Sequence, residues 1–396
     1  MRRVLVAAVL ASITVPVATG SATAACGPPA WQRVATPNIG NGGNDLRGVT
    51  ALSPTDAWAV GSGWDDAEDH STALITHWDG AEWSLVDSPT VGDATLLSAV
   101  HGTATGDVWA VGTSVTEGNG RALIERWTGE AWEVVDAPAP SPEPTVTTTL
   151  TDVFALSGSD AWAVGRWATV PDSPVYMPLI ERWDGADWEV VDAPVFEQWT
   201  GLNAVSASGP ADVWFVGDTE VLVERHDAIV QRGLILHWDG EGLTRYPAPF
   251  NRRHPLNPFT LEDVVAISET DAWAVGEIVK EAGVRTISLH WDGVEWSRVP
   301  LPQPSPQAQL LAGVTALSPT QVWAVGLFLH VRSNEYRTLV YRWNGQEWRT
   351  MSSANRHTGG ELFEVAAVEG FQVAVGQAWS NRLESYRTLA VERCAA

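Results

Sequence analysis

The feature that most constrains this chain is a short strand-like phrase, closed by Val-Gly, that occurs seven times. The first copy reads Asp56-Ala-Trp-Ala-Val-Gly61. The closing glycine returns at intervals of 51, 53, 52, 59, 50 and 50 residues, at Gly61, Gly112, Gly165, Gly217, Gly276, Gly326 and Gly376. Such a period is typical of repeat proteins, in which each unit packs against its neighbours. The 396 residues are therefore predicted to form one domain of seven units.

Each unit contains four short runs rich in Val, Ile, Leu, Trp and Thr and bounded by turn residues, which is the pattern of β-strands. Glycine accepts the positive φ of a tight hairpin turn, and Asp or Asn tolerates it next best. Such turns join the third and fourth runs at Asp79-Gly80, Thr128-Gly129, Asp184-Gly185, Asp239-Gly240, Asp292-Gly293 and Asn344-Gly345. The sequence therefore predicts an all-β fold of four-stranded antiparallel sheets, stacked around an axis as the blades of a β-propeller.

The seventh unit ends at Cys394 without a fourth run, whereas an unused fourth run, Trp31-Gln-Arg-Val-Ala-Thr-Pro37, stands before the first unit. A ring closes if this segment completes the last sheet. We therefore predict a seven-bladed β-propeller over residues 26–396, with an N-terminal strand at about 30–37 in blade seven.

Two motifs in the repeat resemble those of known propeller families. The unit with Asp-x-Trp-Ala-Val-Gly and a fourth run Trp-x-x-Val-x-x-Pro is similar to a degenerate kelch-type repeat of secreted bacterial proteins. The Trp-Asp-Gly-x-x-Trp turn resembles the Asp-box hairpin of sialidase-like propellers, without the Ser or Thr that precedes it there. The resemblance covers nearly the whole chain after residue 25. It implies the fold only, because such propellers include lectins, scaffolds, hydrolases, lyases and oxidases.

The first 25 residues have the organisation of a secretory signal peptide. A charged start, Met1-Arg-Arg, precedes an apolar stretch from Val4 to Ala18, and small residues lead to Cys26. We expect residues 1–25 to be removed and the remainder to be exported to the extracellular space. Lipidation of Cys26 is the alternative, although Thr23 stands where a bacterial lipobox has leucine. No later apolar run approaches the roughly 18 residues that span a bilayer, so no membrane span is expected.

The two cysteines, Cys26 and Cys394, fall at equivalent positions of the repeat. Cys26 lies five residues before Trp31, the spacing at which a tryptophan precedes the fourth run elsewhere, and Cys394 follows Glu-Arg as Trp127 does. We predict a Cys26–Cys394 disulfide that replaces the missing turn of blade seven in an oxidising environment. Closing so long a loop stabilises the fold by about 5 kcal/mol in the chain-entropy model.

The charge of the chain restricts its partners. The net charge is −24 and Lys280 is the only lysine, which argues against nucleic acid and anionic membranes as partners. The acidic run at residues 64–70 offers oxygen ligands of the kind calcium prefers, but its acids do not follow the spacing of a calcium loop. We expect no metal, no cofactor and a monomeric protein.

Most of the tryptophans repeat with the blades. Eighteen of the 22 fall in three columns: Trp58, Trp109, Trp162, Trp214, Trp273 and Trp323; Trp78, Trp127, Trp183, Trp238, Trp291 and Trp343; Trp31, Trp83, Trp132, Trp188, Trp296 and Trp348. We expect them to pack between neighbouring sheets. His or Arg also precedes each third-run tryptophan, and Asp or Gln precedes each second run, as in His77 and Asp56. This pattern predicts a hydrogen-bonded pair in each blade, comparable to the structural tetrad of WD-repeat blades.

The other four tryptophans are candidates for ligand binding. Trp64, Trp167 and Trp379 are expected in the loops between second and third strands, and Trp199 in the loop between blades three and four, on the face that carries all variable loops, including residues 218–232. Trp64 and Trp379 hold the same position in blades one and seven, which touch in a closed ring. Their indoles are suited to stack on sugar rings, with polar contacts from Asp65, Asp66, Arg382 and Tyr386. The alternative is that they shield loop backbone from water.

These observations favour a secreted, non-enzymatic binding or scaffold propeller whose ligand is a carbohydrate, a cell-envelope component or a protein. The alternative is a carbohydrate-active hydrolase or lyase that uses loop acids such as Asp65, Asp66, Glu197 or Glu224. That chemistry requires two carboxyl groups at a defined separation, which a sequence does not show. A purely structural envelope protein is the third hypothesis.

Overall fold

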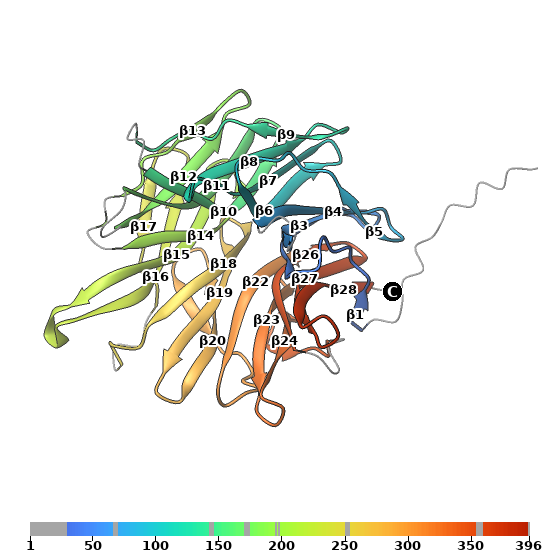
Figure 1. The fold of residues 1–396 in the computed structure, drawn as a ribbon. Helices are drawn as coiled ribbons and strands as arrows, with labels where there is room; N and C mark the ends of the chain where they lie inside the picture. Colours follow the sequence, from blue (N-terminus) through green and yellow to red (C-terminus); the bar gives the residue numbers. More distant parts are fainter. Residues whose placement is uncertain are drawn as a thin grey trace, which may run out of the picture.

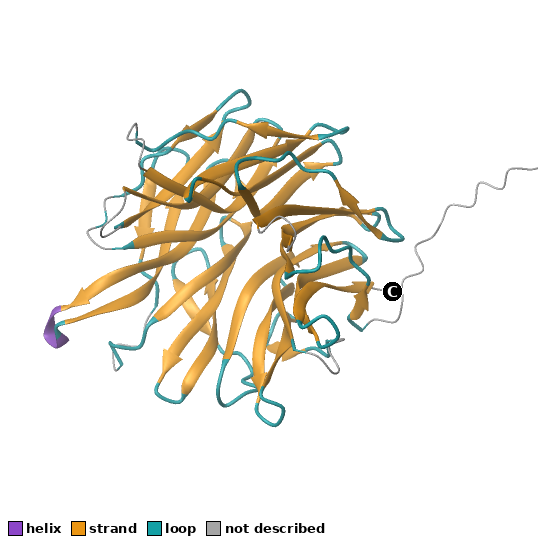
Figure 2. Cartoon of the chain, viewed as in Figure 1, coloured by secondary structure: helices purple, strands orange, loops and turns teal. Residues whose placement is uncertain are grey.

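The computed structural model describes residues 30–65, 70–141, 146–169, 175–194, 196, 199–249, 254–353 and 359–394, without the side chains of Asp65 and Cys394. The predicted signal peptide and Cys26 lie outside these ranges. The described chain forms 28 β-strands in seven four-stranded antiparallel sheets and one short 3-10 helix, η1 (Glu224–His226), as Figure 2 shows. Within the same ranges no helix is long and apolar enough to cross a membrane.

Each blade places its four strands at increasing distance from the ring axis. The innermost strands, which contact one another around the ring, are β2 (Asn44–Ser53), β6 (Ala94–Ala104), β10 (Val146–Ser157), β14 (Thr200–Gly209), β18 (Phe259–Ser268), β22 (Gln309–Ser318) and β26 (Gly360–Val368). The second strands are β3 (Asp56–Asp65), β7 (Asp107–Thr116), β11 (Asp160–Thr169), β15 (Asp212–Val223), β19 (Asp271–Lys280), β23 (Gln321–His330) and β27 (Phe371–Ser380).

The third strands are β4 (His70–Trp78), β8 (Asn119–Trp127), β12 (Tyr176–Trp183), β16 (Ala228–Trp238), β20 (Gly283–Trp291), β24 (Glu335–Trp343) and β28 (Ser385–Cys394). The outermost strands are β5 (Trp83–Val86), β9 (Trp132–Val135), β13 (Trp188–Val190), β17 (Leu243–Tyr246), β21 (Trp296–Val299), β25 (Trp348–Thr350) and β1 (Gln32–Val34). The predicted seven-bladed propeller is therefore confirmed.

The N-terminal strand closes the ring as predicted. β1 pairs with β28 through Gln32 and Glu392, so the first strand lies beside the last in Figure 1. We call this junction of β1 and β28 the seam, and side-chain hydrogen bonds also stabilise it. Asn38 accepts the Thr388 N–H at 3.0 Å, and Glu392 accepts the indole N–H of Trp83 in blade one at 3.0 Å. The seam is thus held by a strand pair and by hydrogen bonds on both sides of it.

The register of blade seven differs by one residue from the predicted alignment. In blade one Trp78 lies opposite Ala57, four residues before the repeat glycine. In blade seven the residue four before the glycine, Gln372, lies opposite Arg393, so Arg393 and not Cys394 takes the tryptophan position. The cause is one extra residue in β28: Leu389 and Leu123 both lie opposite the repeat glycine, but Cys394 is five residues after Leu389 whereas Trp127 is four after Leu123.

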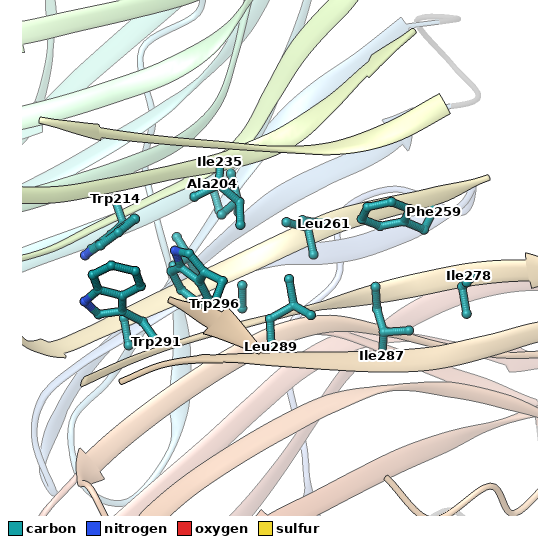
Figure 3. Close-up of a cluster of buried hydrophobic side chains, with 14 residues drawn as sticks. Ala204, Trp214, Ile235, Phe259, Leu261, Ile278, Ile287, Leu289, Trp291 and Trp296 are labelled. Carbon is teal, nitrogen blue, oxygen red and sulfur yellow. The ribbon is translucent and has the colours of Figure 1, made fainter. Parts of the chain in front are cut away.

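Tryptophans fill the spaces between blades. Trp214, which is 1% exposed, contacts Trp291 and Trp296 of the next blade at ring-centroid distances of 5.0 and 5.1 Å (Figure 3). Trp58, Trp109 and Trp273 make the same pair of contacts across their own interfaces. Because each ring buries a large apolar surface, this column supplies a repeated element of the core, as predicted.

The polar columns form six of the seven predicted pairs, on the face opposite the variable loops. In blade six the Arg342 guanidinium lies over the Trp323 ring instead, and its buried Nε has no hydrogen-bond partner in the described structure. His77 and Asp56 lie 2.9 Å apart, and the matching pairs are Arg126–Asp107, Arg182–Asp160, His237–Asp212, His290–Asp271 and Arg393–Gln372. In the outer turn beside them, Gly80 has a φ of 96°, and the Asp79 carboxylate accepts the N–H groups of Glu82 and Ala81. These backbone hydrogen bonds lower the pKa of Asp79. The pairs and turns therefore serve blade structure.

Candidate ligand-binding face

The most prominent element of the variable face is an arm rather than the loop expected at residues 218–232. β15 and β16 continue past the sheet as a two-stranded ribbon capped by η1, and this ribbon projects beyond the other blades in Figures 1 and 2. The run from Thr219 to Val223 is rich in β-branched residues, which favours strand over loop. Leu222 and Ile229, opposite each other near its end, are 50% and 57% exposed.

A polar funnel opens at the ring axis on the same face. Each innermost strand has a β-bulge near its start, which turns one extra side chain toward the axis. The bulged residues are Arg47, Ser98, Thr151, Asn203, Glu262, Ala312 and Phe363, and all of them line a funnel of about 490 Å³. The repeat thus places seven non-identical side chains in one ring, and this is where the blades differ most near the axis.

Three carboxyl groups form the floor of this funnel. Asp152, Asp263 and Glu364 follow the bulged residue in blades three, five and seven, and they also line a deeper axial cavity of about 160 Å³ together with His101. Among the described residues, no group of three or more His, Cys, Asp or Glu side chains has the arrangement of a metal site.

The two aspartates join neighbouring blades. Asp263 accepts the N–H of Val264 at 2.7 Å and the N–H of Val314, in blade six, at 2.6 Å. Asp152 likewise accepts the N–H of Val205, in blade four, at 2.8 Å. Because the oxygens of these carboxyl groups bond to backbone amides, the geometry supports a role in holding blades together rather than in attacking a substrate.

Burial sets the protonation of the axial groups. It raises the pKa of Asp152 to about 7, and it raises the pKa values of Asp263 and Glu364 well above the usual range, with repulsion between the carboxyl groups adding to both. Burial also lowers the pKa of His101 to about 4, so its Nδ1 is free to accept the N–H of Ala155 at 3.1 Å. The axis is therefore largely uncharged in mildly acidic solution.

Four exposed aromatic side chains lie on the rim of the variable face in blades six, seven and one. We call Tyr336, Trp379, Tyr386 and Trp64 the aromatic ridge; their exposed fractions are 43%, 37%, 38% and 39%. Trp379 and Tyr386 are opposite each other on β27 and β28, and their rings meet edge to face with centroids 5.2 Å apart. This pair gives the ridge a fixed centre, because both residues lie in paired strands.

Two glycines connect the parts of the ridge. Gly359 lies beside the backbone of Tyr336, and its carbonyl accepts the Trp379 N–H at 2.8 Å. On the other side, the Gly42 carbonyl accepts a hydrogen bond from Arg387 at 3.1 Å. A Cβ atom on Gly42 would lie 2.7 Å from Cδ1 of Trp64, so only glycine lets this indole settle against the linker. Gly359 and Gly42 thus connect the strands that carry the ridge in the three blades.

The structure revises the expected locations of the tryptophans. Trp64, Trp167 and Trp379 lie in strands, not in loops, because the second and third strands extend further than the repeat pattern predicts. Trp167 is half-buried against the core between blades two and three, and Trp199 lies near Tyr176 at 6.1 Å, so neither joins the ridge. Arg382 is exposed in the turn after β27, next to the ridge.

The loop acids do not gather into a described site. Glu224 is exposed in η1 at the end of the arm. The side chain of Asp65, and both Asp66 and Glu197, lie outside the described residues. The catalytic alternative therefore has no described pair of loop carboxyl groups, while the axial carboxyl groups are engaged with backbone.

Tyr336 is not among the ligand-binding residues predicted from the sequence. The signal was present, because Tyr336-Arg-Thr338 in blade six repeats Tyr386-Arg-Thr388 in blade seven. In blade seven Trp379 lies opposite Tyr386, but in blade six Leu329 lies opposite Tyr336. A search of the sequence for tryptophans outside the repeat columns therefore does not identify the matching position in blade six.

Comparisons with known proteins show the architecture. No protein-family model matches the chain, and no curated protein matches its sequence. The structure of YCF48 bound to D1 peptide superimposes with a TM-score of 0.56 at 12% identity, over 95% of this chain and 99% of that chain. A PL25 polysaccharide lyase, an ulvan lyase, superimposes with a TM-score of 0.55 at 8% identity, over 91% and 96%. A protein of unknown function from Dyadobacter fermentans gives 0.54 at 8% identity, over 92% and 98%. At these identities the likeness shows the propeller fold alone.

Proposed function

We propose that this protein is a secreted carbohydrate-binding propeller that holds a glycan on the aromatic ridge. The observation that carries the proposal is the exposed Trp379–Tyr386 pair, fixed in adjacent strands, with the exposed Trp64 on the next blade. Aromatic rings present a flat apolar face, while the edges of a bound sugar remain free for hydrogen bonds.

The contrast with the other tryptophans supports this proposal. Residues of the repeat columns such as Trp214 and Trp273 are buried between blades at 1% exposure. Trp64 and Trp379 are more than a third exposed and belong to no column. Blade packing therefore accounts for the first set and leaves the second set for contact with a partner.

The test is binding of the purified protein to a panel of glycans and cell-wall polysaccharides, with Trp64→Ala and Trp379→Ala compared with wild type. Each variant is expected to lower affinity about tenfold or more, which corresponds to about 1.4 kcal/mol. Val294→Ala is the matched control, because Val294 is 81% exposed in an outer turn on the opposite face. Unchanged binding by both tryptophan variants would refute the ridge as the site. Release of shorter chains from any bound polysaccharide would favour the hydrolase or lyase alternative.

Secretion and the disulfide belong to the same proposal. The signal-like residues 1–25 support export, and the pairing of β1 with β28 brings residues 30–34 close to the C-terminal strand, which supports a Cys26–Cys394 bond across the open end of blade seven. Mass spectrometry of the non-reduced protein tests the bond. Two free thiols, or an acylated Cys26, would contradict it.

A further inference from the structure

Blades six and seven carry the same hairpin at the rim. The turn between β23 and β24 covers residues 331–334, and the turn between β27 and β28 covers residues 381–384. The last residue of each turn is in the left-handed region, with φ of 55° at Asn334 and 50° at Glu384. Non-glycine residues rarely adopt this conformation, so two occurrences at matching places show that the turns share one geometry.

The copied hairpins present the same side chains. Tyr336 and Tyr386 are the second residues of their strands, and both are exposed. Arg332 and Arg382 are the second residues of the turns and are also exposed, and within the described chain neither guanidinium has an ion pair or a hydrogen bond. Each blade thus offers one tyrosine ring and one unengaged arginine in the same relative position.

The arginine one residue after Tyr386 has a different task. Arg387 donates to the Gly42 carbonyl, as Arg285, in the same repeat position, donates to the Pro306 carbonyl at 2.6 Å. Arg387 and Arg285 thus each hold the linker to the next blade, whereas Arg337 of blade six makes no such bond in the described structure. Arg332 and Arg382 lie outside that repeat position, so the structural requirement that explains Arg387 does not explain them.

The two hairpins belong to neighbouring blades, so a ligand that contacts both must be long. Packed sheets lie about 10 Å apart, which exceeds the reach of a single sugar but not that of a chain of linked sugars. Gly359 lies beside the Tyr336 carbonyl and accepts the Trp379 N–H, so the two hairpins are neighbours at the rim. A polymer that follows the rim would contact one tyrosine ring and one arginine in each of the two blades.

We propose that the ridge binds a linear polysaccharide, with Tyr336 and Arg332 of blade six and Tyr386 and Arg382 of blade seven as two corresponding subsites for its repeating units. The tyrosine ring packs on a sugar face, and the guanidinium donates charge-assisted hydrogen bonds to hydroxyl or carboxylate oxygens. This inference rests on the proposed function and adds the class of ligand, a polymer rather than a single sugar.

The experiment measures affinity against chain length. The probes are cello-, chito- and xylo-oligosaccharides from the dimer to the octamer, with the matching polysaccharides, titrated by calorimetry into wild type and Tyr336→Ala. Two linked subsites make binding of the second unit intramolecular, so wild-type affinity for a recognised series is expected to rise by tenfold or more once a chain spans both. Tyr336→Ala is expected to remove this rise and to lower the number of dimers bound per protein from two to one, because only the blade-seven subsite remains, and Tyr336→Phe, which keeps the ring, is expected to retain both.

The possible failures are distinguishable. If long and short chains of a recognised series bind equally, or if Tyr336→Ala weakens binding equally at every length, the two-subsite inference is wrong although the glycan site stands. If no carbohydrate of any length binds wild type, the proposed function itself fails. Binding of an acidic peptide in place of every glycan would overturn both.

Discussion

At the scale of single residues, the exposure of a tryptophan separates two roles. Trp273 is 1% exposed and contacts Trp343 and Trp348 of the next blade, whereas Trp379 is 37% exposed at the rim. Both are tryptophans on second strands of the same ring. Substituting one at a time therefore compares a core position with a surface position in the same kind of blade.

We predict that Trp273→Ala lowers the free energy of unfolding by about 3–5 kcal/mol, because it leaves a cavity between two blades. Trp379→Ala should lower it by less than about 1 kcal/mol. Urea denaturation followed by circular dichroism measures both. Equal losses in the two variants would mean that Trp379 is a core residue and that the ridge is not free for a ligand.

Residues that repeat were predictable, and residues that do not repeat were not. The tryptophan columns and the Asp56–His77 type of pair appear in nearly every unit, so the sequence alone indicated their structural role. Asp152, Asp263 and Glu364 occupy a column that elsewhere holds glycine or alanine, and the bulges that turn this column toward the axis leave no mark in the sequence.

At the scale of elements, strand pairing replaces a covalent turn at the seam. In six blades a turn joins the third and fourth strands, whereas in blade seven β28 and β1 come from opposite ends of the chain. The period and the displaced Trp31 segment were sufficient to predict this closure. The arm formed by β15 and β16 was not predictable, because an insertion has no counterpart in the other units.

A circular permutant tests the seam. Joining residue 394 to residue 30 through an Asp-Gly turn, and opening new ends between Asp239 and Gly240, moves the cut from blade seven to blade four. Because the seam is a strand pair like the others, the permutant is expected to stay folded, with a melting temperature within a few degrees of wild type.

Deleting residues 30–37 should instead expose the edge of β28 and cause aggregation, since unpaired strand edges recruit other chains. Differential scanning fluorimetry and size-exclusion chromatography measure both, and a deletion variant as stable as wild type would contradict the closure.

At the scale of the whole molecule, buried carboxyl groups couple stability to pH. Burial raises the pKa values of Glu125, Asp152, Glu277 and Glu392 to about 7 and that of Glu181 to about 8, and it also raises those of Asp263 and Glu364. In the unfolded chain these groups titrate near pH 4. Between about pH 4 and 8 the folded protein therefore holds more protons than the unfolded chain, and its stability falls as the pH rises.

His101 acts in the opposite direction. Burial lowers its pKa to about 4, so the stability that it contributes is present above pH 6.5 and is lost as the pH falls through that value toward 4. The effect of this one histidine on the pH dependence of stability is outweighed by that of several carboxyl groups. Above pH 6.5 the histidine no longer changes the free energy of unfolding as the pH rises. We therefore expect the free energy of unfolding to decrease steadily from about pH 6 to pH 8.

The variant Glu181→Gln tests how much of this decrease in stability with pH arises from one residue. Glu181 is fully buried between blades, and both of its carboxyl oxygens lack a hydrogen-bond partner in the described structure. Glutamine keeps the shape and stays neutral, so the advantage in stability of the variant over wild type should grow between pH 5 and pH 8, by on the order of 3 kcal/mol from the raised pKa. Urea denaturation at pH 5, 6, 7 and 8 measures the difference. Parallel curves for variant and wild type would show that Glu181 titrates at the same pH in the folded and the unfolded chain, and the pH dependence would then have to arise at the other buried carboxyl groups.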